Sequence, residues 1–439
     1  MKTRSEIISA ALKRVDGHAP SGKVAKHRKM AVSPFTFLRG ASQLFYADIL
    51  SGVLPLPEAL LNIPMTYVMG DCHTGNFGFI TEGGSHGDKV IFCPNDYDDA
   101  CIGHAAWDIV RFCVSLILVA EHGQGMVRGV YQSEKDVSGK SVLGDNDINQ
   151  AIDKFLSTYR DTCGLSIRKD RKLHDSVIDD FSSPHILYNL YRKAQNRVLD
   201  GEDFTRKSVF AKSVDFDKTP LRFKDDPERF KSLGNDVFAQ LEYAFAPYMN
   251  DAIIDIVERV DSGIGSANMK RYYFLIGPRG FQGSDDLPLY HVVEIKQQRE
   301  AAALFYFPDL NPVNRLNPAH LSAVCQQRMQ RQPDLLLSEL EWNREHWLVH
   351  SRHHARIGIN PEDIAVGKKA TRKGGFLQYA QSCAEALALA HCRGDRRSTR
   401  FERAVCDYLP GAMTELKYVA EDYAQVVTDD WARLVGMVR

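Results

Sequence analysis

Two short motifs carry the side chains whose types and spacing could do chemistry. The first, GDCHTGN, places Asp71 at the end of an apolar stretch, with Asn76 in the same loop. The second, NDYDDA, follows another apolar stretch and contains Asp96, Asp98 and Asp99. One carboxylate can orient an accepting hydroxyl, while an amide oxygen and a second carboxylate hold Mg²⁺. Together the motifs predict a site for phosphoryl transfer from a magnesium nucleotide.

The residues of the first motif each have a plainer alternative. We expect Asp71 to be the base or orienting group, assisted by His73, and Asn76 to be a metal ligand. The alternative is a loop in which His73 only braces the chain and the Asp and Asn bond their own backbone. The second motif favours the functional interpretation, because the two motifs make independent demands.

In the second motif Asp96 is the first choice for metal ligand, because it directly follows the expected strand 90–93. Asp98 lies on the same side by two-residue alternation and is a second ligand candidate. A solvated acidic turn is the alternative. Asp108 begins a helix and is expected to brace the first motif through backbone N–H groups. Arg111, one turn later, is expected to pair with Asp108 or to lie on the surface.

The residues expected to bind nucleotide phosphates lie elsewhere in the chain. Gly263, Gly265 and Ser266 precede a strand, and glycines there let backbone N–H groups approach phosphates. Lys296 lies near the end of the next strand, where it can neutralise phosphate charge. Arg39, in FLRG, either adds positive charge near the phosphates or forms a structural ion pair. The order of glycine loop, strand and lysine favours these roles over a commonplace turn and a solvent-facing lysine.

Three other features are weaker candidates. His350, His353 and His354 have no acidic or cysteine neighbours, which is typical of a surface segment rather than a metal site. His391 ends a helix and is expected to cap it or to pack in the core. Cys72 has no demonstrable histidine partner, so a cysteine hydrolase is not expected.

Apolar periodicity predicts the elements that must position these residues. Because of its charges and prolines, 200–234 is expected to be a long surface segment. Near residue 262 the spacing of apolar residues changes from helical to strand-like. The expected strands are 65–69, 77–80, 90–93, 272–276, 290–295, 335–342 and 347–354. The expected helices are 6–14, 105–121, 146–160, 184–198, 235–260, 319–331, 375–392 and 412–437. The expected units are an N-terminal segment (1–64), a helical lobe with the acidic motifs (65–260), a β-rich nucleotide lobe (261–355) and C-terminal helices that complete the first lobe (356–439).

The composition is ordinary for a globular protein. The 439 residues are 44% hydrophobic and 25% charged with a formal net charge of −1, so no overall field attracts nucleic acid or a membrane surface. The nine cysteines form no CxxC pair, which is typical of a reducing compartment. We find no signal-peptide pattern and no apolar run long enough to span a bilayer, so we expect a cytoplasmic protein. The oligomeric state stays open.

Four motifs resemble those of the bacterial domain-of-unknown-function family 2252 (DUF2252). They are SPFTFLRGA, GDCHTGNFGF, NDYDDACIGHAAWDIVRF and LALAHCRGD. The resemblance covers most of the chain. The function of that family is not established, so the resemblance does not decide the activity.

GDCHTGN and the later Asp96 also resemble the catalytic loop and metal-binding Asp of aminoglycoside and choline kinases. The resemblance implies that Asp71 is the catalytic Asp, that Asn76 and Asp96 bind metal, and that Asp108 braces the loop. It implies an α+β, two-lobed, protein-kinase-like fold.

The order of the motifs differs from that of these kinases, in which the glycine loop and lysine come first. Here those candidates (263–296) follow the catalytic motif, and helix 375–392 resembles the helix that normally leads into it. We therefore expect a circular permutation. Helix 319–331 has no Glu to pair with Lys296, which leaves Glu300 as the other candidate.

The expected activity is Mg-ATP-dependent phosphoryl transfer to a hydroxyl of an unknown small molecule, with ATP and Mg²⁺ as cofactors. Three alternatives stay open. The protein transfers AMP, or it is a nucleotide-binding pseudokinase with a regulatory role, or it is a metal-dependent hydrolase that uses no nucleotide.

Overall fold

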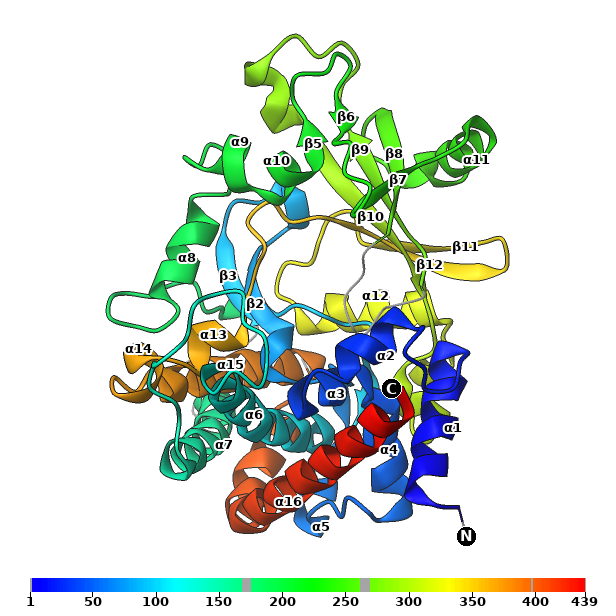
Figure 1. Ribbon diagram of the computed structural model, residues 1–439. Coiled ribbons are helices and arrows are strands. Elements are labelled where there is room, and N and C mark those ends of the chain that lie inside the picture. Colours follow the sequence, from blue (N-terminus) through cyan, green and yellow to red (C-terminus); the bar gives the residue numbers. More distant parts are fainter. Residues whose placement is uncertain (1, 168–174, 261–268, 396–397, 439) are drawn as a thin grey trace.

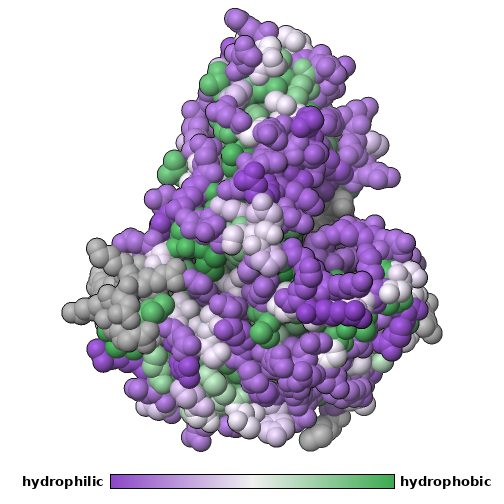
Figure 2. All heavy atoms as spheres, turned by 90° about the vertical axis from the view of Figure 1, so that its left-hand side faces the viewer, coloured by the Kyte–Doolittle hydropathy of each residue, from purple (hydrophilic) through white to green (hydrophobic). Residues whose placement is uncertain are grey.

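The computed structural model describes residues 2–167, 175–260, 269–395 and 398–438. Its architecture is mixed α+β, which confirms the α+β class expected from the sequence. A body of packed helices lies below a lobe built on an antiparallel sheet (Figure 1). From the side, the upper lobe is narrower than the body, and the visible surface is mostly hydrophilic (Figure 2). Within the described residues, no helix has both the length and the apolar content of a membrane span.

Helix α6 (Ala105–Val127) forms the centre of the helical body. Nearly all of its residues are buried, as expected for a helix that is apolar on every side. It packs against α7 and α16, and α7 packs against α15. The other long helices are α7 (Asp145–Ile167), α15 (Gly375–Gly394) and α16 (Arg400–Val438). The N-terminal helices are α1 (Arg4–Asp16), α2 (Ala25–Met30), α3 (Pro34–Gly40), α4 (Ser42–Ser51) and α5 (Glu58–Leu61).

Two small antiparallel pairings lie outside the six-stranded sheet of the upper lobe. Strands β1 (Thr66–Val68) and β4 (Cys101–Gly103) form one pair. Strands β2 (Phe77–Thr81) and β3 (Val90–Pro94) form the expected hairpin, and β13 (Ile357–Gly358) adds to β2.

These pairings bring two loops together. Residues 69–76, here called the Asp71 loop, connect β1 to β2, and residues 95–100, the acidic loop, return from β3 to β4. Because both loops join the same two pairings, their backbones meet. The N–H of Asn95 donates to the carbonyl of Asn76 at 3.1 Å.

The sheet of the upper lobe has six strands in the order β11-β12-β10-β9-β8-β7. Its central strand β10 (His291–Gln298) pairs with β9 (Arg271–Ile276) and β12 (Glu345–Ser351). Helix α12 (Pro318–Met329) packs against this sheet and against α15. The remaining strands are β7 (Phe230–Ser232), β8 (Ile253–Arg259) and β11 (Ser338–Trp342).

The two faces of this sheet differ in polarity. Phe274, Ile295 and Trp347 lie on an apolar face that packs with α11 (Asn235–Phe245). Side chains alternate along a strand, so Lys296 and its cross-strand neighbours occupy the other face. That face is polar where it meets the acidic loop.

The expected helix 235–260 is wrong in its second half. Pro247 cannot continue a helix, and the β-branched residues that follow form β8 instead. The expected surface excursion 200–234 contains short helices and strands. They are α9 (Phe204–Lys207), α10 (Val209–Ser213), β5 (Val214–Asp215), β6 (Arg222–Phe223) and β7. The sheet lobe therefore begins before residue 261. The short helices elsewhere are α8 (Tyr188–Gln195), α13 (Pro361–Ile364) and α14 (Lys368–Thr371).

Candidate functional site

The start of the Asp71 loop is fixed by backbone contacts. Gly70 has a φ of +75°, and a Cβ at this position would collide with the backbone oxygen of Asp99. Only glycine therefore combines this conformation with the close approach of the acidic loop. Both oxygens of Asp108 accept N–H groups of the loop, from Met69 at 2.6 Å and from Gly70 at 3.1 Å.

Asp108 is held in turn by a buried chain of side chains. His391 Nε2 lies 3.1 Å from the Asp108 carboxylate, and the hydroxyl of Tyr159 lies 2.7 Å from His391 Nδ1. His391 therefore lies in the core, where it makes polar contacts. Residues of α6, α7 and α15 together set the position of the Asp71 loop.

Asp71 forms an ion pair with Arg111 and keeps 15% of its side chain exposed. Arg111 Nε donates to Asp71 Oδ1 at 2.8 Å, and its Nη2 donates to the carbonyl of Leu38 at 2.6 Å. The expected pairing of Arg111 with Asp108 is wrong, because the guanidinium reaches across the loop. Burial raises the pKa of Asp71 to about 6; Arg111 opposes this rise, and Asp99 and Asp96 add to it. Asp71 thus titrates close to neutrality, as a general base should.

His73 and Asn76 are oriented by the same loop. His73 Nδ1 accepts the N–H of Gly75 at 3.0 Å, so Nε2 carries the proton of the neutral ring and lies 3.6 Å from Asp71. Burial, with help from nearby arginines, holds the pKa of His73 well below its usual value. The amide nitrogen of Asn76 donates to the carbonyl of Asp71 at 3.0 Å, which leaves its Oδ1 as the atom for a cation.

Lys296 joins the two halves of the chain. Its ammonium forms an ion pair with Asp98 of the acidic loop, and Gln298 Nε2 lies 3.3 Å from the same carboxylate. Neither Glu300 nor helix α12 supplies the acidic partner. Burial lowers the pKa of Lys296 to about 8, while the charge of Asp96 opposes that decrease.

A second ion pair connects the same parts. Arg299, just after β10, holds both oxygens of Asp99 at 2.7 and 3.1 Å. Ser42 and the N–H of Ala302 also donate to Asp99. These contacts hold the pKa of Asp99 below its usual value despite burial. The acidic loop is therefore tied to the end of β10 at two successive carboxylates.

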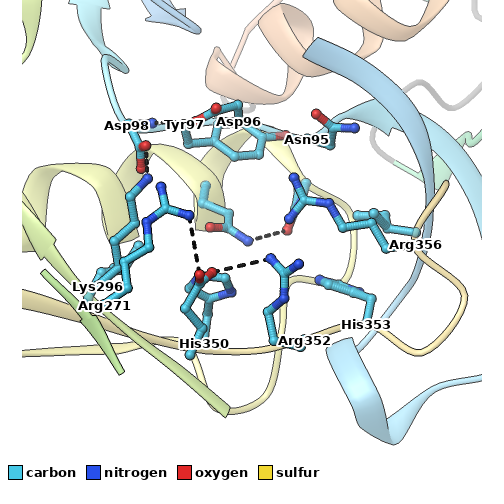
Figure 3. Close-up of a pocket in the computed structure, with 15 residues that line it drawn as sticks. Asn95, Asp96, Tyr97, Asp98, Arg271, Lys296, His350, Arg352, His353 and Arg356 are labelled. Atoms are coloured by element: carbon cyan, nitrogen blue, oxygen red, sulfur yellow. Dashed lines mark hydrogen bonds and ion pairs between the residues drawn. The ribbon is translucent and has the colours of Figure 1, made fainter. Parts of the chain in front are cut away.

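The acidic loop and the polar face of the sheet enclose a cavity (Figure 3). Asp96 lines it from the loop, and its Oδ1 accepts the N–H of Asp98 at 3.2 Å. The charge of Asp96 also acts on the pKa values of Asp71 and Lys296. Asp96 therefore lies within electrostatic reach of both. The other lining residues are Ile80, Asn95, Tyr97, Asp98, Arg271, Glu294, Lys296, Gln326, Gln330, Leu348, His350, Arg352, His353 and Arg356.

The sheet side of this cavity is rich in cationic groups. Glu294 is surrounded by His350 at 2.9 Å and by Arg271 and Arg352, each at 3.3 Å. These neighbours hold the pKa of Glu294 well below its usual value. Arg356 also lines the cavity, and within the described part of the chain it forms no ion pair. The cavity thus offers positive charge to an anionic ligand.

Sequence reasoning missed most of these cations. The segment HSRHHARIG was expected to lie on the surface, but His353 and His354 are buried and Arg352 and Arg356 line the cavity. Side chains that alternate along the neighbouring strand, counted from the position opposite Lys296, include Arg352. This rule could have identified Arg352 as a cavity residue. No local sequence pattern identifies Arg356 as a cavity residue.

Arg39 lies on another side of the Asp71 loop. Its guanidinium carbon would be 3.4 Å from a Cβ at Gly75, and the charges of Asp71 and Asp96 favour its ionised form. It lines a separate groove rather than the cavity of Lys296. The expected phosphate-binding residues Gly263, Gly265 and Ser266 lie outside the described residues.

Both loops and the cavity fall within one family match. A family model described as an uncharacterized protein conserved in bacteria (DUF2252) matches residues 19–133 and 136–437. The chain belongs to this family. The match confirms the resemblance seen in the sequence motifs of this DUF2252 protein. No curated protein and no solved structure matches the chain.

Proposed function

We propose that this DUF2252 protein is a Mg-ATP-dependent phosphotransferase with a kinase-like, two-lobed fold in circularly permuted order. One observation carries the proposal. Asp71, Asn76 and Asp96 lie on two touching loops, and the second loop also pairs with Lys296 of the sheet. Residues far apart in the sequence are thus brought together, which supports a site for phosphoryl transfer.

The proposed roles follow from the geometry. Asp71 orients the accepting hydroxyl and takes its proton, and the Nε2–H of the neutral His73 lies 3.6 Å from the Asp71 carboxylate. Lys296 and Arg356 bind phosphate oxygens in the cavity. Arg39 adds positive charge on the far side of the Asp71 loop.

Mg²⁺ fits the donor set of this site. The described residues include no group of three or more His, Cys, Asp or Glu that is arranged to hold a metal alone. Mg²⁺ does not need such a group, because it is usually held by one or two protein oxygens together with phosphates and water. Asp96 and Asn76 Oδ1 would be those oxygens, and the bound ion would neutralise phosphate charge. Asp98 is the weaker candidate, since Lys296 and Gln298 occupy its carboxylate.

The order of elements supports the permutation. Helix α15 supplies His391, which contacts the bracing Asp108 although it lies near the end of the chain. The sheet with Lys296, and α12 packed against it, both come between Asp108 and α15 in sequence. The half that would precede the catalytic loop in an unpermuted chain therefore follows it here.

Thermal unfolding with ATP, in the presence and absence of Mg²⁺, tests the proposal. A ligand at 100 times its Kd stabilises a protein by roughly 2.7 kcal/mol. We expect a Mg²⁺-dependent shift that Asp96→Asn removes and that the exposed control Asp88→Asn retains. A folded wild-type protein that shows no shift with ATP or ADP would contradict the nucleotide site.

Analysis of the products separates the alternatives. Release of ADP indicates phosphoryl transfer, whereas release of pyrophosphate indicates transfer of AMP. Binding of ATP without any product in an acceptor screen indicates a regulatory pseudokinase. A metal-dependent hydrolase without nucleotide should keep its activity in Lys296→Met.

A further inference from the structure

A second groove lies next to the Asp71 loop, lined by residues of α3, α6, the segment after α6, and the start of α13. Arg39 lines this groove, and its guanidinium also packs on Gly75 of the Asp71 loop. Arg39 therefore connects the groove to the Asp71 loop, within reach of the charge of Asp71 and away from the cavity of Lys296. The residues that line it are Phe35, Thr36, Arg39, His122, Gln132, Ser133, Glu134, Asn360, Pro361 and Glu362.

The outer wall of this groove is held in place by several contacts. Glu362 Oε1 accepts the hydroxyl of Ser133 at 3.0 Å and the N–H of Glu134 at 3.2 Å. Beside them, Lys135 pairs with Asp363 at 2.5 Å. Segment 132–134 is therefore fixed to α13, and the groove has two defined sides.

Two residues that line the groove have buried polar atoms that lack partners. Within the described residues, Nε of Arg39 and Nδ1 of His122 are buried without a hydrogen bond. His122 is only 7% exposed, and its ring contacts Phe35 at a centroid distance of 5.8 Å. Buried polar groups in native proteins normally have partners, so these atoms point to a ligand. Burial lowers the pKa of His122 to about 4, so its ring is neutral near pH 7.

We propose that this groove binds the acceptor, and that the acceptor is a small hydroxyl-bearing molecule with a carboxylate or phosphate group. The inference rests on the proposed phosphotransferase function. The anionic group binds to the guanidinium of Arg39, which puts the hydroxyl of the same molecule next to Asp71.

The transfer step conserves atoms and charge. The hydroxyl oxygen forms a bond to the γ-phosphorus of ATP while the bond from that phosphorus to the β,γ-bridging oxygen breaks. ADP leaves with that oxygen, and the hydroxyl proton passes to Asp71. Arg39 holds the acceptor and does not exchange a proton, because a guanidinium stays charged.

The carboxylates of Glu134 and Glu362 also line the groove, so the preference for an anion over an amine rests on Arg39, which forms no ion pair among the described residues. Arg39 is the only cationic side chain among the described residues that line the groove, and it lies within reach of the charge of Asp71. One oxygen of Glu362 is already occupied by its two donors, and Glu134 lies at the exposed rim. An ammonium group placed next to Asp71 would face the guanidinium at close range.

Saturation-transfer NMR on the full-length protein tests the proposal. The probes are glycerate and glycerol 3-phosphate, with glycerol as the uncharged analogue and ethanolamine as the cationic one. Gln132→Trp blocks the rim of the groove, and Gln282→Trp is the matched control at an exposed position in the other lobe. ATP binding, measured by thermal shift in the same samples, reports on the nucleotide site separately.

We expect saturation transfer to one or both anionic probes and a loss of at least fivefold in Gln132→Trp. Glycerol and ethanolamine should show no saturation transfer, and the control variant should bind the anionic probes as the wild type does. The ATP shift should be unchanged in both variants. Binding of only one anion distinguishes a carboxylate from a phosphate acceptor. An intact ATP shift with no anion binding, or with anion binding that Gln132→Trp leaves unchanged, overturns the acceptor proposal alone. Loss of the ATP shift in wild type instead overturns the proposed function, and the acceptor role with it.

Discussion

The ammonium group of Lys296 forms an ion pair with the carboxylate of Asp98, two residues after Asp96 in the acidic loop. The lysine comes from the centre of the six-stranded sheet, and the loop comes from the other lobe. The pair therefore fixes the sheet relative to the proposed metal ligand. A phosphate that binds Lys296 has to share it with Asp98 or displace that carboxylate.

Substitution of Asp98 should show how much this ion pair contributes. Asp98→Asn leaves a nearly buried ammonium without its partner, and we expect it to lower the free energy of unfolding by about 3 kcal/mol. Lys296→Met should be less harmful, since Asp98 is more exposed than Lys296. Urea denaturation provides the measurement.

The double variant Asp98→Asn/Lys296→Met completes the cycle. It should be more stable than Asp98→Asn alone, because it removes the unpaired charge. If the effects of the two single substitutions simply add, the two side chains do not interact in solution.

The pH dependence of turnover should report on Asp71. Its pKa of about 6 means that a base at this position is protonated and inactive below pH 6 and ionised above it. We therefore expect kcat to rise through a midpoint near pH 6 and then level off. Asp71→Asn should lower kcat by roughly 10²- to 10⁴-fold while the ATP-dependent thermal shift persists.

Arg111 offers a matched test of the same assignment. Its charge opposes the increase in the pKa of Asp71, so Arg111→Met should move the midpoint above pH 6. Circular dichroism confirms whether this buried substitution leaves the protein folded. A folded variant with an unchanged midpoint would show that a different group limits the rate.

The sequence predicted those parts of the fold that depend on local patterns. Apolar periodicity located α6 and α7, and strand-like runs located β2, β3 and β10. The two motifs became adjacent loops because each one links the same two strand pairs, a relation that the sequence did not reveal, since β4 was not among the expected strands. The prediction was wrong for residues 253–259. It extended a helix past Pro247 and ignored the β-branched residues that follow.

The contacts of the candidate site were less predictable, because they depend on tertiary distance. Arg111 is one helical turn from Asp108, yet it reaches Asp71 across the loop. Asp98 looked like a metal ligand from its spacing, but its partner Lys296 lies in the other lobe. Arg356 follows the last strand of the sheet and has no local pattern that marks it as a cavity residue.

Asp108 should be a structural requirement for the Asp71 loop. In Asp108→Asn, one amide hydrogen-bond donor faces a backbone N–H of Met69 or Gly70, so a buried hydrogen bond is lost. We expect the free energy of unfolding to decrease by roughly 2 to 3 kcal/mol. Asp88→Asn is the exposed control. Urea denaturation that gives the same midpoint for both variants would contradict the bracing role.

His354 should make the protein less stable in acid. It is 2% exposed, and both ring nitrogens are buried without a partner among the described residues. The ring packs against Phe204 and Phe210, at centroid distances of 5.2 and 6.1 Å. Burial lowers its pKa from 6.5 to about 3. The unfolded chain therefore binds a proton that the folded protein excludes, and stability is lost as the pH falls from about 6.5 toward 3.

His354→Leu removes both effects. Because leucine has no polar atoms to leave unpaired, we expect the variant to be more stable by about 1 kcal/mol at pH 7. Between pH 6 and pH 4 it should lose roughly 1 kcal/mol less per pH unit than the wild type. Urea denaturation at a series of pH values provides the measurement, with exposed His18→Leu as the control. Parallel pH profiles for His354→Leu and the wild type would mean that His354 is hydrated or hydrogen-bonded in solution.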